Sequence, residues 1–169
     1  MDRMTLESLY DTYAEPLFRY LCSMVHRESE ARDRLQDLFL KIARNPGCLD
    51  EVTDVRAYLF RLAHNLVIDG FRRSNRRDQT KHLLALDTIP IFATTCDPDA
   101  QALRAGMAVA LTELPIAQRE VVYLKLYEEM TFEAIADLLE LSPNTTASRY
   151  RYGIEKLRCS LKPLYDDIT

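Results

Sequence analysis

Apolar residues recur at helical spacing along most of this 169-residue chain, and this periodicity constrains the fold more than any other feature. One stripe consists of Leu6, Leu9, Tyr10, Tyr13, Leu17 and Leu21, and a second consists of Ala31, Leu35, Leu38, Phe39 and Ile42. Residues three or four apart lie on the same side of a helix, so each stripe predicts one amphipathic helix with a buried face. No segment shows convincing strand alternation, and the sequence therefore predicts an all-α protein.

Breaks in this periodicity divide the chain into two helical halves. The segment NPGCLDEVTD (45–54) ends the second helix, and a third helix is predicted at about 55–73. Its predicted stripe consists of Val55, Leu59, Leu62, Ala63 and Leu66. The pattern dissolves after residue 73, resumes near Ala100, stops at Leu114-Pro115 and restarts through Val121 to Leu126. We expect two small helical domains, residues 1–76 and 100–169, joined by a flexible linker at 77–99.

The sequence lacks the motifs of most catalytic and cofactor sites. Its four glycines are scattered, so no phosphate-binding loop can form, and neither GxSxG nor HExxH occurs. Cys22, Cys48, Cys96 and Cys159 have no metal-ligand spacing, which favours buried free thiols over disulfides or zinc. No run of about 18 apolar residues and no signal-peptide profile is present. We expect a cytoplasmic protein without catalytic residues, metal, cofactor, small-molecule substrate or membrane insertion.

Positive charge is concentrated in two segments of an acidic chain. The net charge is −4, yet residues 54–77 carry +4 and residues 142–162 carry +4, which leaves −12 on the rest. Two basic surfaces on an acidic body are suited to binding DNA phosphates in two places, while the body repels DNA elsewhere. Two ordinary solvated helix faces are the alternative interpretation.

The second basic segment follows a helix-turn-helix pattern. In TFEAIADLLELSPNTTASRYRYGIEKLR (131–158), Thr131 starts a short helix with Phe132, Ile135, Ala136 and Leu139 inward, and Glu140-Leu141-Ser142 form the turn. Ser142 is placed to cap the next helix, whose first residue is Pro143. At about 100° per residue, one face of that helix carries Thr146, Tyr150, Gly153, Ile154 and Leu157. The opposite face carries Asn144, Thr145, Ser148, Arg151 and Tyr152, with Arg149 flanking it. Short polar residues and arginines are typical of helices that read base edges, although a helical hairpin with a polar exterior is the alternative.

Three stretches of the sequence together resemble one protein family. ALTELPIAQREVVYLKLYEEMTFEAIADLLELSPNTTASRYRYGIEKLR is similar to the C-terminal promoter-reading domain of bacterial sigma factors. EARDRLQDLFLKIAR resembles their polymerase-docking region, and VRAYLFRLAHNLVIDGFRR resembles their melting and minus-ten helix. The small two-domain layout resembles the extracytoplasmic-function (ECF) group.

This resemblance implies a function, partners and site residues. Residues 1–76 would be sigma region 2, which docks on core RNA polymerase and recognises the minus-ten element, and residues 100–169 would be region 4, which recognises the minus-thirty-five element. The implied docking residues are Asp33, Leu35, Gln36, Asp37 and Phe39, with Leu35 and Phe39 equally suited to the domain core. The implied minus-ten and melting residues are Tyr58, Phe60, Arg61, Asn65, Arg72, Arg73, Arg76 and Arg77. Asn65 would capture a flipped base through its amide, while Tyr58 and Phe60 would either stack on unwound bases or fill the core. An anti-sigma factor is an implied further partner, with the linker patch LLALDTIPIF as a candidate contact.

The sequence departs from the family pattern at several positions. Thr146 and Ala147 replace a usual valine and lysine, which makes one inward position polar and removes a basic contact to DNA. Glu129 replaces a usual glycine, which is expected to change the turn. A stand-alone helix-turn-helix regulator that binds DNA tightly without polymerase is the alternative function, and a protein-interaction module without DNA contact is a third.

Overall fold

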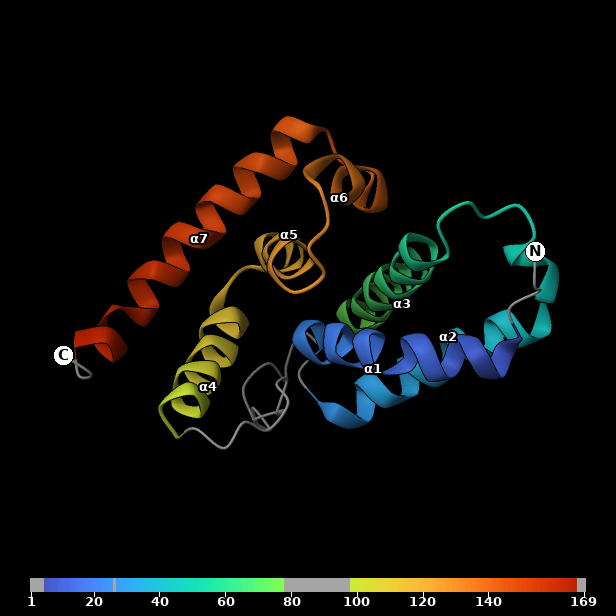
Figure 1. The fold of residues 1–169 in the computed structure, drawn as a ribbon, viewed down its shortest axis with the longest axis horizontal. Coiled ribbons are helices and arrows are strands. Elements are labelled where there is room, and N and C mark those ends of the chain that lie inside the picture. Colours follow the sequence, from blue (N-terminus) through green and yellow to red (C-terminus); the bar gives the residue numbers. More distant parts are fainter. Residues whose placement is uncertain (1–4, 26, 78–97, 167–169) are drawn as a thin grey trace. The chain divides into compact units, whose positions relative to one another are not determined.

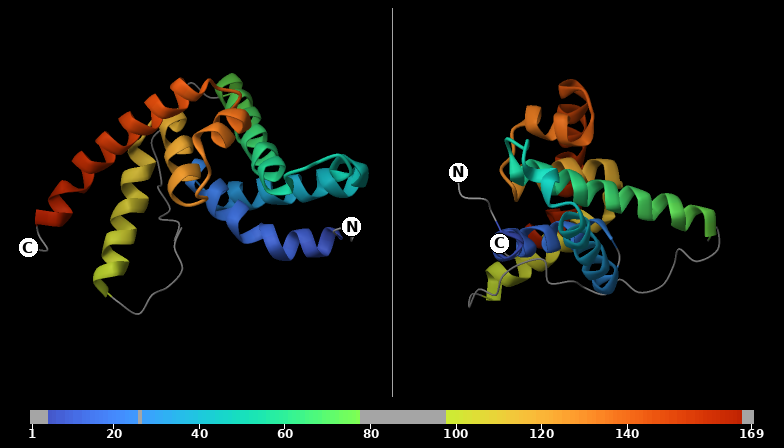
Figure 2. Two further views of the ribbon diagram at one scale, coloured as in Figure 1. Left: turned by 45° about the horizontal axis from the view of Figure 1, so that its top comes forward. Right: turned by 90° about the vertical axis from the view of Figure 1, so that its right-hand side faces the viewer.

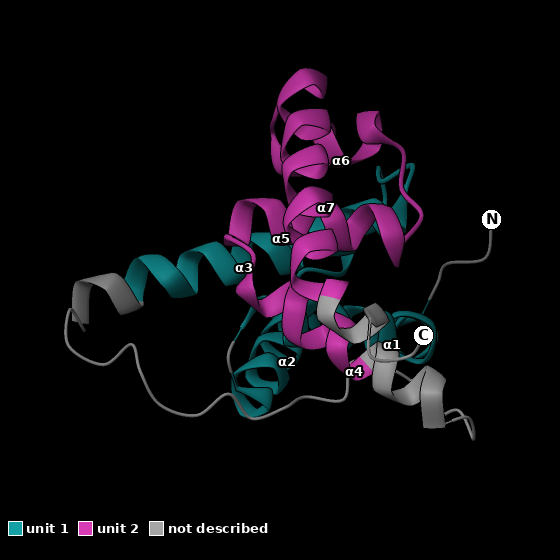
Figure 3. Cartoon of the chain, turned by 90° about the vertical axis from the view of Figure 1, so that its left-hand side faces the viewer, with its two compact units in different colours: residues 1–87 teal, residues 88–169 magenta. Residues whose placement is uncertain are grey.

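The computed structural model describes residues 5–25, 27–77 and 98–166, with side chains described for 5–25, 27–73 and 105–162. These residues form helices, and no strand occurs among them, which confirms the all-α prediction. The chain divides into two compact units, residues 1–87 and 88–169 (Figure 3). The predicted linker at 77–99 lies almost entirely outside the described residues, as do Cys96 and the side chains of Arg76 and Arg77.

Unit 1 consists of three long helices in mutual contact (Figures 1 and 2). They are α1 (Leu6–Met24), α2 (Glu28–Arg44) and α3 (Val55–Arg77), with a short 3-10 helix η1 (Pro46–Leu49) after α2. Side-chain caps define two of the starts: Thr5 Oγ1 accepts from the Ser8 N–H at 3.2 Å, and Asp54 Oδ1 accepts from the Ala57 N–H at 2.9 Å. Each cap satisfies a backbone donor that has no partner within its helix.

In unit 1, the buried residues of α1 and α2 match the predicted stripes at most positions. All five predicted residues of α2 are buried, as are Leu9, Leu17 and Leu21 of α1. Leu6 and Tyr10 are exposed, so the predicted α1 stripe is wrong at these two positions, because α2 and α3 cover α1 incompletely near its start.

The buried face of α3 is rotated away from the predicted stripe. Leu59 and Ala63 are buried as expected, but the other buried residues are Phe60, Val67 and Gly70, while Val55, Leu62 and Leu66 are half-buried. The Phe60 ring packs edge-on against Tyr20 of α1, with 5.4 Å between ring centres. Apolar residues occur on several sides of α3, so periodicity alone identified the helix but not the side that is buried.

Unit 2 contains α4 (Pro98–Glu113), α5 (Ile116–Leu126), α6 (Phe132–Leu139) and α7 (Pro143–Asp166). Helix α7 contacts each of the other three (Figure 1). Its core includes Ala110, Leu111, Leu114, Val122, Leu157 and Leu161. The buried Arg119 guanidinium donates from Nη2 to the backbone oxygens of Thr112 and Leu114, at the end of α4. A cation at this end of a helix satisfies free carbonyls and interacts favourably with the helix dipole.

The described cysteines are free, but they are not uniformly buried. Cys22 is buried, Cys48 is half-buried and Cys159 is exposed. The prediction of buried thiols is therefore confirmed for Cys22 and wrong for Cys159. Cys159 lies near the C-terminal end of α7, where one side of the helix is in solvent.

Candidate nucleic-acid interface

The helix-turn-helix is formed as the sequence predicted, with α6 and α7 joined by a tight turn. Thr131 Oγ1 accepts from the Ala134 N–H at 3.1 Å and starts α6. Glu140 ends α6 in the left-handed conformation, with φ of 55°, and the Leu141 N–H donates to the Ala136 oxygen at 2.8 Å. This arrangement satisfies the last carbonyls of α6 and redirects the chain into α7.

Ser142 organises the first turn of α7. Its Oγ accepts from the Thr145 N–H at 3.1 Å and lies 2.8 Å from Thr145 Oγ1. The Thr146 hydroxyl donates to the Ser142 backbone oxygen at 3.1 Å. Thr146 is fully buried, so this bond gives its polar group a partner where the family usually has valine. The departure at Thr146 is therefore accommodated within the helix.

One face of α7 packs against its own unit. Thr146, Gly153 and Leu157 are buried, and the half-buried Tyr150 and Ile154 pack against the core cluster. At Gly153 the helices approach so closely that an added Cβ would lie 2.6 Å from the Val122 Cγ2 atom of α5. The inward face predicted from the sequence is confirmed.

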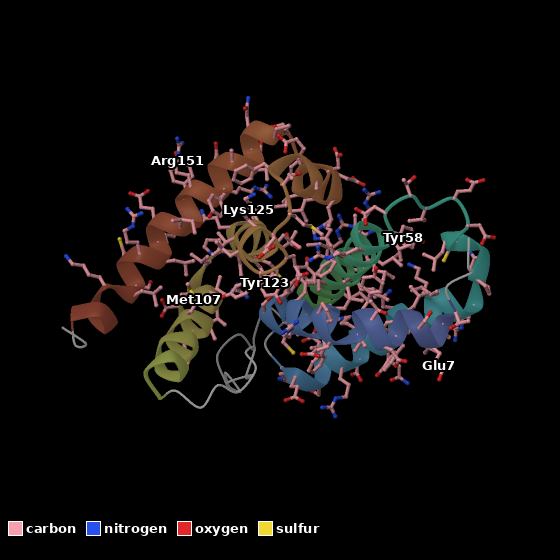
Figure 4. All side chains as sticks on the ribbon, in the orientation of Figure 1. Glu7, Tyr58, Met107, Tyr123, Lys125 and Arg151 are labelled. Carbon is pink, nitrogen blue, oxygen red and sulfur yellow. The ribbon has the colours of Figure 1, made fainter. Side chains whose placement is uncertain are left out.

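The opposite side of α7, which we call the reading face, consists of Asn144, Thr145, Ser148, Arg151 and Tyr152, with Arg149 flanking it. Asn144, Thr145, Arg151 and Tyr152 are exposed, whereas Ser148 and Arg149 are half-buried. The Arg151 side chain projects away from α4 and α5 (Figure 4). Its guanidinium carbon lies 5.3 Å from the centre of the Tyr152 ring. Ala147, which stands where the family usually has lysine, is exposed beside these residues and leaves room for close approach.

In the turn between α5 and α6, Glu129 stands where the family usually has glycine. Glu129 has φ of 53°, a left-handed conformation that glycine adopts without strain. The turn is closed by the Met130 N–H, which donates to the Leu124 oxygen at 3.1 Å. The Lys125 ammonium, labelled in Figure 4, donates to the Met130 oxygen at 3.0 Å and lies 4.9 Å from the centre of the Phe132 ring. These contacts hold the turn in a conformation that glutamate alone disfavours.

In unit 1, α3 presents polar residues along one side. Arg61, Asn65 and Arg72 are spaced four and seven residues apart and are all exposed. Arg73 is also exposed, and Arg72 Nη1 lies 3.7 Å from Asp69 Oδ1. Tyr58 is half-buried near the start of this side (Figure 4), and burial together with a hydrogen bond to Cys48 raises its pKa. The structure thus aligns Tyr58, Arg61, Asn65 and Arg72 on one helix.

Phe60 does not join this group. Its ring is fully buried between α1 and α3, on the other side of the helix from Asn65. A ring without exposed surface cannot stack on a base, so of the two roles open to Phe60 the DNA contact is corrected and the core position is supported.

The predicted docking residues of α2 also divide into exposed residues and core residues. Asp33, Gln36 and Asp37 are exposed, whereas Leu35 and Phe39 belong to the core, with the Phe39 ring 4.9 Å from that of Tyr10. Sequence reasoning missed Leu40, an exposed leucine whose position continues the Asp33, Gln36 and Asp37 series. The spacing of three, four and seven residues was the signal available for Leu40.

Comparison with known proteins identifies the family. Residues 9–77 match the family model described as Sigma-70 region 2, and residues 106–157 match Sigma-70, region 4. The RNA polymerase sigma factor CarQ of Myxococcus xanthus is 30% identical over 90% of this chain and 86% of its own length. The ECF RNA polymerase sigma factor SigL of Mycobacterium tuberculosis is 29% identical over 94% of this chain and 90% of its own. The chain belongs to the ECF group of RNA polymerase sigma factors. The resemblance seen in the sequence is confirmed.

Solved structures share the fold of this sigma factor. The sigma factor RpoE of Bartonella quintana, crystallised with the anti-sigma factor NepR, has a TM-score of 0.75 at 21% identity, covering 92% of this chain and 95% of that chain. CnrH, in complex with the cytosolic domain of CnrY, has a TM-score of 0.65 at 23% identity, covering 94% and 88%. Within the described residues, no helix is long and apolar enough to cross a membrane, and no group of side chains is arranged to hold a metal ion. As a sigma factor, the protein directs core RNA polymerase to promoters.

Proposed function

We propose that this sigma factor divides promoter recognition between its two halves. Residues 1–76 act as region 2, which docks on core polymerase and opens the minus-ten element, and residues 100–169 act as region 4, which binds the minus-thirty-five element. Residues 77–99 join them. The support for this division is that each half matches its own family model and presents its own polar helix face.

The minus-ten surface is the exposed side of α3. Asn65 captures an unpaired base through its amide, which donates and accepts hydrogen bonds at once. Tyr58 stacks on an adjacent base, and Arg61, Arg72 and Arg73 bind phosphates. We assign the same role to Arg76 and Arg77, which are the last two residues of α3. The alignment of Tyr58, Arg61, Asn65 and Arg72 on one helix is the observation that carries this proposal.

The docking surface is the exposed side of α2. Asp33, Gln36 and Asp37 supply carboxylates and an amide, and Leu40 supplies an apolar contact beside them. The acidic residues suit a basic helical partner, and the exposed leucine suits one that is partly apolar. Burial of the Leu40 side chain against such a partner contributes about 1.5–3 kcal/mol when water is excluded. We assign core RNA polymerase as that partner.

The remaining partners follow the family. The minus-thirty-five element is contacted by the reading face of α7. Two proteins of the same fold, RpoE and CnrH, are described in complexes with NepR and the cytosolic domain of CnrY, the former an anti-sigma factor. By analogy, an anti-sigma factor binds this chain. The protein acts in the cytoplasm as an initiation factor, without catalysis or cofactor of its own.

Run-off transcription with core polymerase and genomic fragments tests the proposal. We expect defined products that require this protein, and we expect Asn65→Ala to reduce them strongly while upstream DNA binding persists. Glu51→Ala, at an exposed loop residue of the same unit, is the matched control and should behave as wild type. No promoter-specific product from any fragment, or tight operator binding that does not need polymerase, would contradict it.

A further inference from the structure

Two side chains of the reading face are positioned to read bases. Thr145 has its hydroxyl within 2.8 Å of the capping Ser142 Oγ, so it presents mainly its methyl group. Ser148 and Arg149 are half-buried at the side of the helix. Asn144 and Arg151 are exposed and carry the amide and guanidinium groups that make paired hydrogen bonds to bases.

The spacing of these two residues sets the distance between the bases they reach. They are seven residues apart, which is about 20° short of two full helical turns, so they project from the same side of α7. Along the axis they are separated by about 10.5 Å at about 1.5 Å per residue. This length corresponds to about three steps of a DNA strand at about 3.4 Å each.

The residues between them permit a close approach. Ala147 and Ser148 flank the line from Asn144 to Arg151, and both are small. Ala147 stands where the family usually has lysine, so no long side chain holds the helix away from the groove floor. An exposed methyl group in the major groove favours a thymine methyl.

The Tyr152 ring restricts the Arg151 side chain. The guanidinium carbon lies 5.3 Å from the ring centre, within the range of a cation–π contact. One turn further on, the exposed Glu155 lies on nearly the same side of α7 and repels phosphates. The base-reading segment therefore ends at Arg151, about two turns after it begins.

We propose that Asn144 reads an adenine and Arg151 reads a guanine about three base pairs away in the minus-thirty-five element. This assignment rests on the proposed role of α7 in binding that element. Asparagine bonds both N6 and N7 of adenine, and arginine bonds both O6 and N7 of guanine. Each pair is expected to give about a 5- to 150-fold preference for its base.

A promoter obtained from the run-off experiment, with its upstream element randomised, provides the test. The library is transcribed by the full-length protein with core polymerase, and the transcribed templates are sequenced. We expect enriched adenine and guanine at two positions about three base pairs apart. Asn144→Ala should remove the adenine preference alone, and Arg151→Ala the guanine preference alone.

Two further variants separate base reading from folding and charge. Arg151→Lys keeps the positive charge but lacks the planar fork, so the guanine preference should fall while total transcription stays above that of Arg151→Ala. Lys156→Ala, at an exposed basic residue beyond the reading segment, should reduce transcription without shifting any base preference. If the adenine and guanine preferences persist in Asn144→Ala and Arg151→Ala, the base assignment is overturned but the proposed role of α7 is not. Equal transcription of every upstream sequence would overturn the proposed role of α7 as well.

Discussion

At the scale of single residues, two glutamates occupy backbone conformations that glycine adopts without strain. Glu129 and Glu140 have φ of 53° and 55°. A left-handed conformation costs a residue with a Cβ about 1–2 kcal/mol, and the extra chain entropy of glycine offsets about 0.5–1 kcal/mol of that. We expect Glu129→Gly to raise the free energy of unfolding of unit 2 by about 0.5–1 kcal/mol, measured by urea denaturation of the full chain.

The matched control for Glu129→Gly is Glu155→Gly, an exposed position inside α7. There the same substitution should lower the free energy of unfolding by about 1 kcal/mol, because glycine is a poor helix former. If both variants were destabilised alike, the Glu129 side chain would contribute more to stability than its backbone conformation costs.

The thiols of Cys22 and Cys159 are expected to differ in reactivity. Burial, together with the nearby Glu28 carboxylate, raises the pKa of the Cys22 thiol to about 12. Since the thiolate is the reactive form, Cys22 should resist alkylation at pH 8 while the exposed Cys159 is labelled rapidly. Mass spectrometry of labelled peptides measures both rates. Fast labelling of Cys22 in the native protein would contradict its burial in the core.

The raised pKa of Cys22 determines whether its contribution to the free energy of unfolding rises or falls with pH. The folded-state pKa of Cys22 lies above the value of about 8.5 expected in the unfolded chain. The stabilising contribution of the neutral thiol is therefore complete below about pH 8.5 and is lost as the pH rises toward the folded-state pKa.

At the scale of helices, α7 depends on a close approach to α5. A Cβ at position 153 would lie 2.6 Å from the Val122 Cγ2 atom, and Val122 is fully buried. Overpacking of this kind costs about 1–3 kcal/mol. We expect Gly153→Ala to lower the unfolding temperature of unit 2 and to weaken upstream-element binding, measured by calorimetry and by transcription. Cys159→Ala, at an exposed position on the same helix, should do neither.

Sequence reasoning succeeded for the elements and their order, because helical periodicity and capping residues are local signals. Ser142 and Thr131 could be recognised as caps from the residues around them. The buried side of α3 could not, because Phe60 and Leu66 are both apolar and only the packing of α1 shows which one is covered. The same limit left the role of Phe60 open between a DNA contact and the core. Leu40, in contrast, could have been recognised from its spacing to Asp33, Gln36 and Asp37. Which members of the candidate site touch DNA stays a prediction.

At the scale of the whole molecule, the charge distribution restricts where DNA can bind. The chain carries −4 in total, with +4 in each of residues 54–77 and 142–162. Each basic segment includes exposed arginines on a single helix, which is α3 for residues 54–77 and α7 for residues 142–162. Phosphate binding is therefore local, and non-specific affinity of the free protein for DNA should be weak and sensitive to salt.

The energy of strand opening determines what this sigma factor does without polymerase. Opening about five base-pair steps costs roughly 7 kcal/mol at about 1.4 kcal/mol per step. Stacking or capture of one or two bases by Asn65 and Tyr58 returns only about 1–3 kcal/mol each. We expect no permanganate-reactive thymines in promoter DNA with the free protein, and clear reactivity once core polymerase is added. Asn65→Ala should reduce that reactivity in the complete enzyme, whereas Glu51→Ala should not. Open thymines with the free protein would mean that its own contacts supply the missing energy, and that strand opening does not depend on core polymerase.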